Sequence, residues 1–367
     1  MRKNSKKKLH RFFQSVIASA IVVVSVGSIC LRVPQFVMGD NWDFKNSFTN
    51  LSITCASKED GSVNSIKKNS EVSSNKNNSE KLSVDENTYT KNDDKKQEVT
   101  KPTEKVDNSG KKKYPVYESQ LGTAGEITIK NTTDYTVDVE KELAKPLGFK
   151  MEDTIEPQVL IVHTHTSEAY LKEDVGFYYE DYSGRSTDES ENVTSVGDAI
   201  VKKLNSRGIG ALHSLKHHDS PTYNGSYNRS EVTTYSYLKK YPSIKVVIDI
   251  HRDAIGNGGE EGKYKPTFVA NGKKGAQIMI MSGYDPTGAY GFSHWEKNLS
   301  FALKLEQTAE KLYPGMTRPL YFGDFAYNMF INSGSLLIEV GTDVNTVEEA
   351  TYTGELLGDV LAQVLQQ

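Results

Sequence analysis

Histidine and carboxylate side chains stand at the ends of three apolar runs in this sequence. The runs, each with the polar residues that follow it, are Val159–Val162 with His163, His165 and Glu168, Val246–Ile250 with His251, Arg252 and Asp253, and Leu336–Ile338 with Glu339. In an open α/β sheet, ligands bind just outside the carboxyl ends of the strands. If the three runs are neighbouring strands, these side chains meet at one edge of a sheet.

The residue types in these positions suit zinc chemistry. His165, Glu168 and the distant His251 provide two imidazoles and one carboxylate, a ligand set that leaves the fourth position of a tetrahedral Zn²⁺ open to water. Zinc lowers the pKa of such a water to about 7. A further carboxylate is then needed to accept a proton and return it to the leaving group, and Glu339 is the candidate for this general base.

Two alternatives for the ligands stay open. Glu191 stands at the entrance to a predicted helix, where it could replace Glu168 as the ligand or simply interact with the helix dipole. His163 alternates with His165, so strand pleating would place both on one side. His163 could therefore be an alternative ligand, a residue that supports a ligand, or a substrate contact. Asp249 and Asp253 are either partners of the ligands or ordinary loop acids.

The other histidines show no such pattern. They are His217 and His218, which are predicted to be solvated, and His10, His213 and His294, which have no carboxylate at ligand spacing. The two cysteines, Cys30 and Cys55, lie far from the three runs, so any metal there must use histidine and carboxylate ligands.

The sequence around the candidate site predicts strands that alternate with helices. The predicted strands are Val159–Val162, Ile209–Leu212, Val246–Ile250 and Leu336–Val340, together with a hairpin in which Thr267–Ala270 and Gln277–Met281 flank Asn271-Gly272. The predicted helices are Asn192–Arg207, a helix from a capping box at Ser293–Glu296 to about Tyr313, and Val347–Leu365. This alternation predicts an α/β fold, a single domain with a mostly parallel central sheet flanked by helices.

Composition divides the 367 residues into four segments. They are a basic cytoplasmic tip (1–11), a predicted transmembrane anchor (12–33) that is uncharged from Phe12 to Leu31, an extracytoplasmic polar tether predicted to be largely disordered (34–113), and the catalytic domain (114–367). The tip carries a net charge of +6, and because cationic residues stay on the cytoplasmic side, the domain is expected outside the cell. The domain carries −12, which argues against a nucleic acid as its partner.

Five segments together resemble the stage II sporulation protein P family. They are VLIVHTHTSEAY (159–170), NVTSVGDAI (192–200), VVIDIHRDA (246–254), RPLY (318–321) and LLIEVGTDVNTVEEA (336–350). The resemblance covers a motif core of roughly residues 157–365, and the anchor and tether match the layout of that family. It implies a fold similar to that of zinc-dependent N-acetylmuramoyl-L-alanine amidases.

The resemblance implies a membrane-anchored peptidoglycan hydrolase of sporulation and engulfment, with one zinc ion in the catalytic domain. Such an enzyme cleaves the amide between N-acetylmuramic acid and the L-alanine of the stem peptide, with cleavage of peptide cross-links as a second reaction. The family works at the sporulation septum with stage II sporulation proteins D and M. The competing hypotheses are a zinc peptidase that acts only on stem peptides and a non-catalytic wall-binding scaffold that recruits other hydrolases.

The resemblance also assigns roles to single residues. The related amidases have ligand histidines that correspond to His165 and His251, and a catalytic glutamate that corresponds to Glu339 with Asn345 a few residues later. In those amidases the glutamate ligand opens a helix, which favours Glu191, whereas the HTHxxE motif of the family favours Glu168. Candidates for contacts with glycan or stem peptide are Tyr223, Tyr227, Arg229, Arg252, Arg318 and Asn328.

Overall fold

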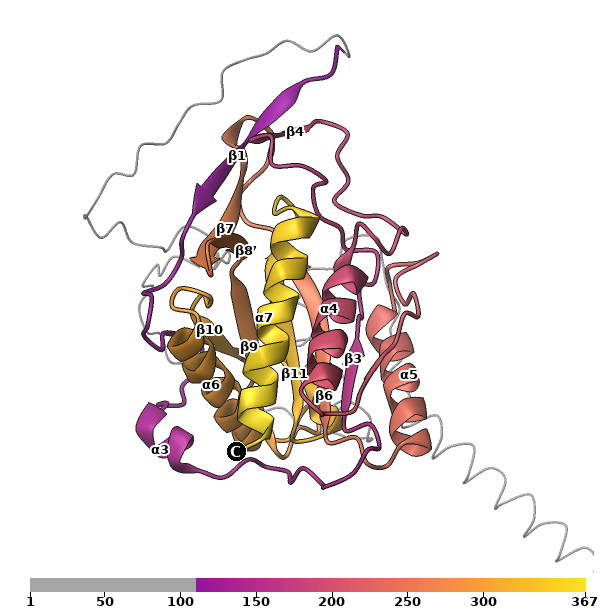
Figure 1. Cartoon of the computed structure of the whole chain (residues 1–367), viewed down its shortest axis with the longest axis vertical. Coiled ribbons are helices and arrows are strands. Elements are labelled where there is room, and N and C mark those ends of the chain that lie inside the picture. Colours follow the sequence, from indigo (N-terminus) through magenta and orange to yellow (C-terminus); the bar gives the residue numbers. More distant parts are fainter. Residues whose placement is uncertain (1–109) are drawn as a thin grey trace, which may run out of the picture. The chain divides into compact units, whose positions relative to one another are not determined.

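The computed structural model describes residues 110–367, which are drawn in colour in Figure 1. The predicted tip (1–11), the predicted anchor (12–33) and all but the last few residues of the predicted tether (34–113) lie outside the described residues. Within residues 110–367, no helix has the length and apolar character needed to cross a bilayer. The membrane anchor therefore stays a prediction.

A seven-stranded sheet forms the centre of the described part of the chain. Its strands, in spatial order, are β2 (Ile129–Asn131), β10 (Leu320–Gly323), β9 (Ile278–Gly283), β11 (Ser335–Thr342), β6 (Val246–Asp253), β3 (Val159–Val162) and β5 (Ala211–His213). Neighbouring strands are parallel except for β9 and β11, which are antiparallel. The predicted α/β class with a mostly parallel central sheet is confirmed.

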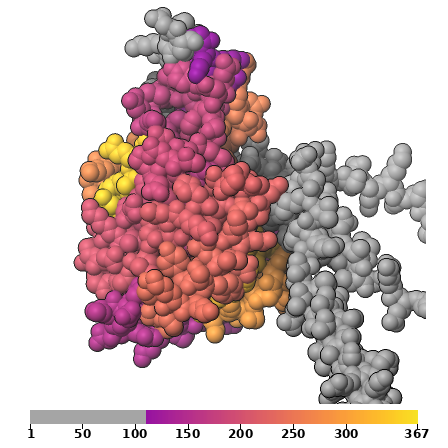
Figure 2. All heavy atoms as spheres, turned by 90° about the vertical axis from the view of Figure 1, so that its right-hand side faces the viewer, coloured from indigo at the N-terminus to yellow at the C-terminus, as the bar shows by residue number. Residues whose placement is uncertain are grey.

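Helices cover both faces of this sheet (Figure 1). They are α4 (Val193–Ser206), α6 (Trp295–Leu312) and α7 (Val347–Leu365) on one face and α5 (Ser226–Lys240) on the other. Successive side chains of β3 point to opposite faces of the sheet and so belong to two different cores. Ile161 belongs to the large cluster with α4 and α7, whereas Leu160 packs with Leu238 of α5. Figure 2 shows the molecule from the side on which α5 lies.

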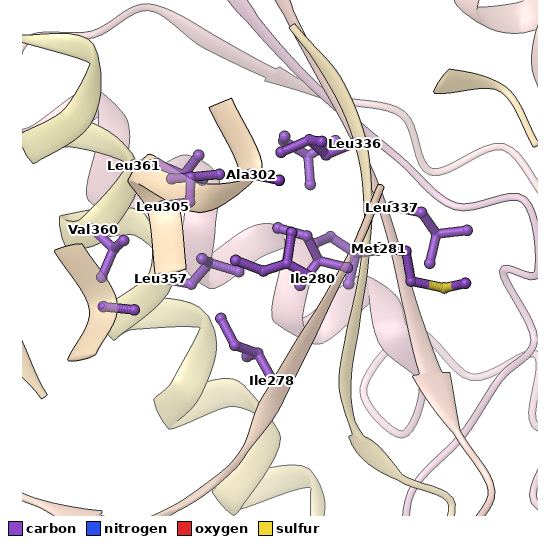
Figure 3. Close-up of a cluster of buried hydrophobic side chains, with 14 of the residues drawn as sticks. Ile278, Ile280, Met281, Ala302, Leu305, Leu336, Leu337, Leu357, Val360 and Leu361 are labelled. Atoms are coloured by element: carbon purple, nitrogen blue, oxygen red, sulfur yellow. The ribbon is translucent and has the colours of Figure 1, made fainter. Parts of the chain in front are cut away.

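A large apolar cluster fills the space between the sheet and its larger helical layer. Figure 3 shows Ile278 and Ile280 of β9 pointing toward Leu357 of α7, and all three side chains are buried. Leu337 and Met281 lie on the opposite side of the same strands. Each such side chain contributes about 1.5–3 kcal/mol when it is fully buried, so this layer holds β9 and β11 firmly in register.

A second, four-stranded sheet stands beside the central one. Its strands, in spatial order, are β4 (Phe177–Tyr179), β1 (Lys113–Ser119), β7 (Lys263–Ala270) and β8 (Lys273–Ala276). A short helix, α3 (Val139–Ala144), and two 3₁₀ turns, η1 (Gly259–Glu261) and η2 (Met329–Ile331), complete the described elements. The sequence did not predict the second sheet, and β1 shows that folded structure already begins at Lys113.

Two predictions about local structure need correction. The Asn271-Gly272 turn does connect a hairpin, but its second strand is β8, and most of the predicted partner Gln277–Met281 lies in β9 of the other sheet. The capping box at Ser293–Glu296 is wrong, because the N-cap of α6 is His294 and makes no side-chain capping bond. Trp295 instead packs edge-on against neighbouring aromatic rings, so tertiary packing sets the start of α6.

The closing helix begins as its sequence indicates. Thr346 accepts a hydrogen bond from the backbone N–H of Glu349, and the Glu349 carboxylate accepts one from the backbone N–H of Thr346. This reciprocal capping box satisfies backbone donors that the first helical turn would otherwise leave free. It fixes the segment between β11 and α7, residues 343–346, which begins four residues after Glu339.

Candidate metal and catalytic site

The segment after β3 is held in a tight turn by two buried carboxylates. Asp249 of β6 accepts hydrogen bonds from the backbone N–H of Thr164 at 2.8 Å and from its hydroxyl at 2.6 Å. Asp219 accepts bonds from the backbone N–H and the hydroxyl of Ser167. Because both anchors lie next to the HTHxxE segment, they fix its backbone and direct the side chains of His165 and Glu168.

His165, Glu168 and His251 come together at the carboxyl ends of β3 and β6, as the sequence predicted. Glu168 Oε2 lies 3.3 Å from Nδ1 of His251. The rings of His165 and His251 are nearly perpendicular, at 87°, with centroids 5.2 Å apart. All three residues are buried.

The electrostatic surroundings give each of these residues a defined charge preference. Burial lowers the pKa of His165 to about 4, so its ring is neutral at pH 7, which is the form that binds a metal. Burial opposes ionisation of Glu168, but its contact with His251 and the nearby charges of His251 and Arg252 outweigh burial and hold the pKa of Glu168 at about 2. Burial opposes protonation of His251, but Asp249 and Glu168 outweigh burial and raise the pKa of His251 well above its usual value. A metal ion bound here would displace that proton and take its place beside Glu168.

The donors present fit a zinc ion. Among residues 110–367, no three histidine, cysteine or acidic side chains are already arranged as a closed metal-binding group. Nevertheless, two ligands about 2.1 Å from a tetrahedral ion lie about 3.4 Å from each other, close to the 3.3 Å between Glu168 and His251. The Nδ1 atom of His165 is buried without a hydrogen-bond partner in the described part of the chain, a costly state that a metal would relieve.

Glu339 adjoins these residues through the pairing of β11 with β6. It lies in register with His251, and its Oε2 atom is buried with no hydrogen-bond partner among the described residues. Burial, together with the charge of Asp253, raises the pKa of Glu339 to about 8. A carboxylate with such a pKa exchanges protons near neutral pH, as a general base must.

The alternative ligands lie elsewhere. Glu191 forms an ion pair of 2.6 Å with Lys172 and accepts a hydrogen bond from Ser186, close to the start of α4. His163 turns away from the ligands, with Nδ1 2.9 Å from the carbonyl oxygen of Ile250 and Nε2 2.7 Å from His213. The geometry therefore favours Glu168 as the carboxylate ligand. His163 instead links the end of β3 to β6 and β5 through its contacts with Ile250 and His213.

One expectation about the other histidines is wrong, and a second histidine has a partner distant in sequence. His218 was predicted to be solvated, but it is fully buried, with its ring nitrogens near the carbonyl oxygen of His163 and the hydroxyl of Thr233. His213 has a carboxylate partner, since its Nδ1 lies 2.8 Å from Asp198. Fifteen residues separate that pair in the sequence, and only the packing of β5 against α4 brings the two side chains together.

The remaining candidates separate into site residues and structural residues. Arg318 lies 2.9 Å from Asp253 in an ion pair beside Glu339, and Arg252 donates its backbone N–H to Glu168. Asn345 braces the turn after Glu339 instead, because its amide oxygen accepts the backbone N–H of Thr342.

The polar and aromatic candidates on the α5 side divide in the same way. The guanidinium of Arg229 donates to the carbonyl oxygens of residues 218, 222 and 224, and Asn328 donates to Tyr227 and Ser230, so both brace the loop and helix. The ring of Tyr227 lies edge-on to His165 with centroids 5.5 Å apart, which places it at the border of the site.

Sequence reasoning found only part of a group of side chains that borders His165, because it named Tyr223 but not Arg185. Tyr223 was only one of several aromatic candidates, yet its ring stacks on His165 with centroids 4.4 Å apart. The guanidinium of Arg185 lies over the Tyr223 ring, 4.9 Å from the ring centroid, and forms an ion pair with Asp219 at 2.9 Å. Arg185 follows no apolar run, so no pattern in the sequence pointed to it.

Comparison with models of protein families shows the family to which this chain belongs. The model of the stage II sporulation protein P (SpoIIP) family matches residues 43–362. The chain belongs to this family. The matched range includes every residue of the candidate site, and the resemblance inferred from the five sequence segments is confirmed.

Individual relatives are more distant. Stage II sporulation protein P of Bacillus subtilis (strain 168) is 29% identical over 217 residues, which are 56% of this chain and 50% of the relative. The chain thus spans about half the length of the curated relative it matches. N-acetylmuramyl-L-alanine amidase Ami1 from Mycobacterium abscessus superposes over 57% of this chain and 97% of its own, at 14% identity and a TM-score of 0.33. An N-acetylmuramoyl-L-alanine amidase from Clostridium difficile 630 superposes over 58% of this chain and 96% of its own, at 15% identity and a TM-score of 0.34. The family assignment rests on the family match and not on these two structures.

Proposed function

We propose that this member of the stage II sporulation protein P family is a zinc-dependent peptidoglycan hydrolase that cleaves the amide between N-acetylmuramic acid and L-alanine. The observation that carries the proposal is the meeting of His165, Glu168 and His251 beside the carboxylate of Glu339, whose Oε2 atom is buried. Two imidazoles and a carboxylate next to a free carboxyl group are the set that hydrolytic zinc sites use.

The residues of the site divide the chemistry among them. His165, Glu168 and His251 would hold the zinc ion, which supplies a Lewis acid that acidifies water and polarises a carbonyl group. Glu339 would take a proton from the attacking water and deliver it to the amide nitrogen as the carbon–nitrogen bond breaks. Tyr223 and Tyr227 border His165 and would limit the access of bulk water.

The substrate and location belong to the same proposal. Peptidoglycan is the abundant amide polymer outside the membrane of a spore-forming cell, and the predicted anchor at residues 12–33 would keep the domain beside it. We assign the protein to the sporulation septum, single-pass, with the domain extracytoplasmic. Peptide cross-links are a second proposed substrate, and stage II sporulation proteins D and M are the proposed partners.

Digestion of purified wall sacculi tests the proposal. The full chain loaded with zinc should release stem peptides from glycan strands, and a chelator should abolish the release. Mass spectrometry of the products distinguishes the reactions: glycan chains without peptides show amidase activity, whereas disaccharide-peptides with opened cross-links show endopeptidase activity. Binding to sacculi without cleavage of any bond would refute the proposal and support a wall-binding scaffold.

A further inference from the structure

Arg318 is the largest side chain that is fully buried in the described structure, and it is only partly paired. It is 1% exposed, and its Nη1 donates to Asp253 at 2.9 Å. Its Nε and Nη2 atoms are buried without a hydrogen-bond partner among residues 110–367. An unpaired charged donor costs far more in the interior than in water, so this free edge calls for an anionic or strongly polar partner.

The sheet topology places this edge next to the reacting groups. Arg318 lies two residues before β10 and donates its backbone N–H to Ile278 of β9, whereas Asp253 lies in β6. In the sheet order β10-β9-β11-β6, the two strands between them carry Met279 and Glu339, which face each other in register. The Arg318–Asp253 ion pair therefore spans β9 and β11, and both residues are close enough to Glu339 to act on its pKa.

The free edge has the shape that an acyl oxygen or a carboxylate requires. The N–H bonds of Nε and Nη2 run parallel on one side of the planar guanidinium and can bind two oxygens, or one oxygen twice. Asp253 holds the opposite side, so the plane is fixed before a ligand arrives. Donors fixed in this way are the means by which enzymes stabilise negative charge that develops on a carbonyl oxygen.

We propose that the free edge of Arg318 binds the acyl oxygen of the scissile amide and, after cleavage, the carboxylate of the acyl product. This inference rests on the proposed function. In the hydrolysis, the water oxygen bonds to the acyl carbon, and the carbon–nitrogen bond breaks with its electron pair going to nitrogen. Both protons of the water end on that nitrogen, one of them by way of Glu339, so a carboxylate and an ammonium group leave.

Substitution of Arg318 in the full chain tests this role. Arg318→Met removes the donors but keeps an unbranched chain of about the length of the arginine's aliphatic stem, and kcat for release of stem peptides should fall by roughly 10²- to 10³-fold with a smaller change in KM. Arg318→Lys should recover part of the loss, because it restores the charge without the fork. Zinc content should stay at one ion per chain in both variants.

Product binding gives a readout that does not depend on turnover. N-acetylmuramic acid carries the carboxylate of the acyl product, and its titration followed by NMR should show at least roughly tenfold weaker binding to Arg318→Met than to the wild type. Glu142→Gln is the control, because Glu142 is equally buried and hydrogen-bonded, but at the interface of α3 and α6. The control should lose stability and keep both kcat and product affinity.

The outcomes separate the two proposals. If Arg318→Met keeps kcat and product affinity within about threefold of wild type and only loses stability like the control, Arg318 merely ties β10 to β6 and the inference is overturned. If Arg318→Met does not fold, Arg318→Lys decides in the same two assays, because full kcat and full product affinity would equally overturn it. A wild type that releases no stem peptide would overturn the proposed function itself.

Discussion

Asp249 Oδ1 lies 3.0 Å from Nε2 of His251, on the side of the ring away from Glu168, which lies near Nδ1. The two carboxylates therefore approach the two nitrogens of one imidazole. An acid that holds the outer nitrogen of a ligand histidine fixes the tautomer and orientation of the ring and raises its basicity. With Asp249 on Nε2, the Nδ1 atom is the one directed toward a metal.

Asp249→Asn should weaken zinc binding by roughly 10- to 100-fold, because the amide cannot support the histidine as a carboxylate does. The amide can still accept the backbone N–H of Thr164, so the turn after β3 should persist. Competition with a chromophoric chelator would measure the affinity. An unchanged affinity would show that Asp249 serves the fold alone.

Glu168→Ala should lose zinc, whereas Glu191→Ala should retain it. Glu168 lies 3.3 Å from His251, while Glu191 is held by Lys172 near the start of α4. Elemental analysis of both purified variants, with His165→Ala as the positive control for metal loss, measures the difference. Loss of zinc in the Glu191 variant with retention in the Glu168 variant would reverse the assignment of the ligand.

Glu339→Gln should keep zinc and lose activity by roughly 10²- to 10⁴-fold, the usual contribution of a general base. The amide has the size of the carboxyl group but accepts no proton. Release of peptides from sacculi, measured beside the metal content, tests this. A variant with both zinc and full activity would exclude Glu339 from the proton transfer.

The sequence predicted which candidate side chains lie together more completely than it predicted the fold. His165, Glu168, His251 and Glu339 were found because each follows a buried apolar run, and chain geometry brings the ends of neighbouring parallel strands together. Such a signal is local, and it survives errors in the surrounding elements. The hairpin shows this, because its second strand was misplaced without moving any of the four residues.

What the sequence missed depends on contacts between distant segments. The polar helix α5 has a weakly apolar stripe, and its Leu238 gains burial only against β3 and β6. His218 lies in a polar stretch, yet it is buried because Thr233 of α5 meets its ring. The second sheet pairs β1 with β7 across more than a hundred residues, which no local pattern can encode.

Stability should depend on pH through Glu306 of α6, which lies apart from the candidate site. Its side chain is buried, one oxygen accepts the backbone N–H of Thr128, and the other has no hydrogen-bond partner in the described structure. Burial, with a smaller effect of Glu310, raises the pKa of Glu306 to about 8. The folded state thus holds a proton that the unfolded chain releases near pH 4.5.

Because the folded state binds the extra proton, the free energy of unfolding should fall as pH rises from about 4.5 to about 8, by up to roughly 1.4 kcal/mol per pH unit from this group. Glu306→Gln removes the titration and keeps an acceptor for Thr128, so its stability relative to wild type should increase with pH over that window. Urea unfolding at several pH values measures both curves, and Glu126→Gln, at an exposed position, controls for the loss of one charge. Curves for wild type and Glu306→Gln that stay parallel from pH 5 to 8 would contradict a raised pKa at this position.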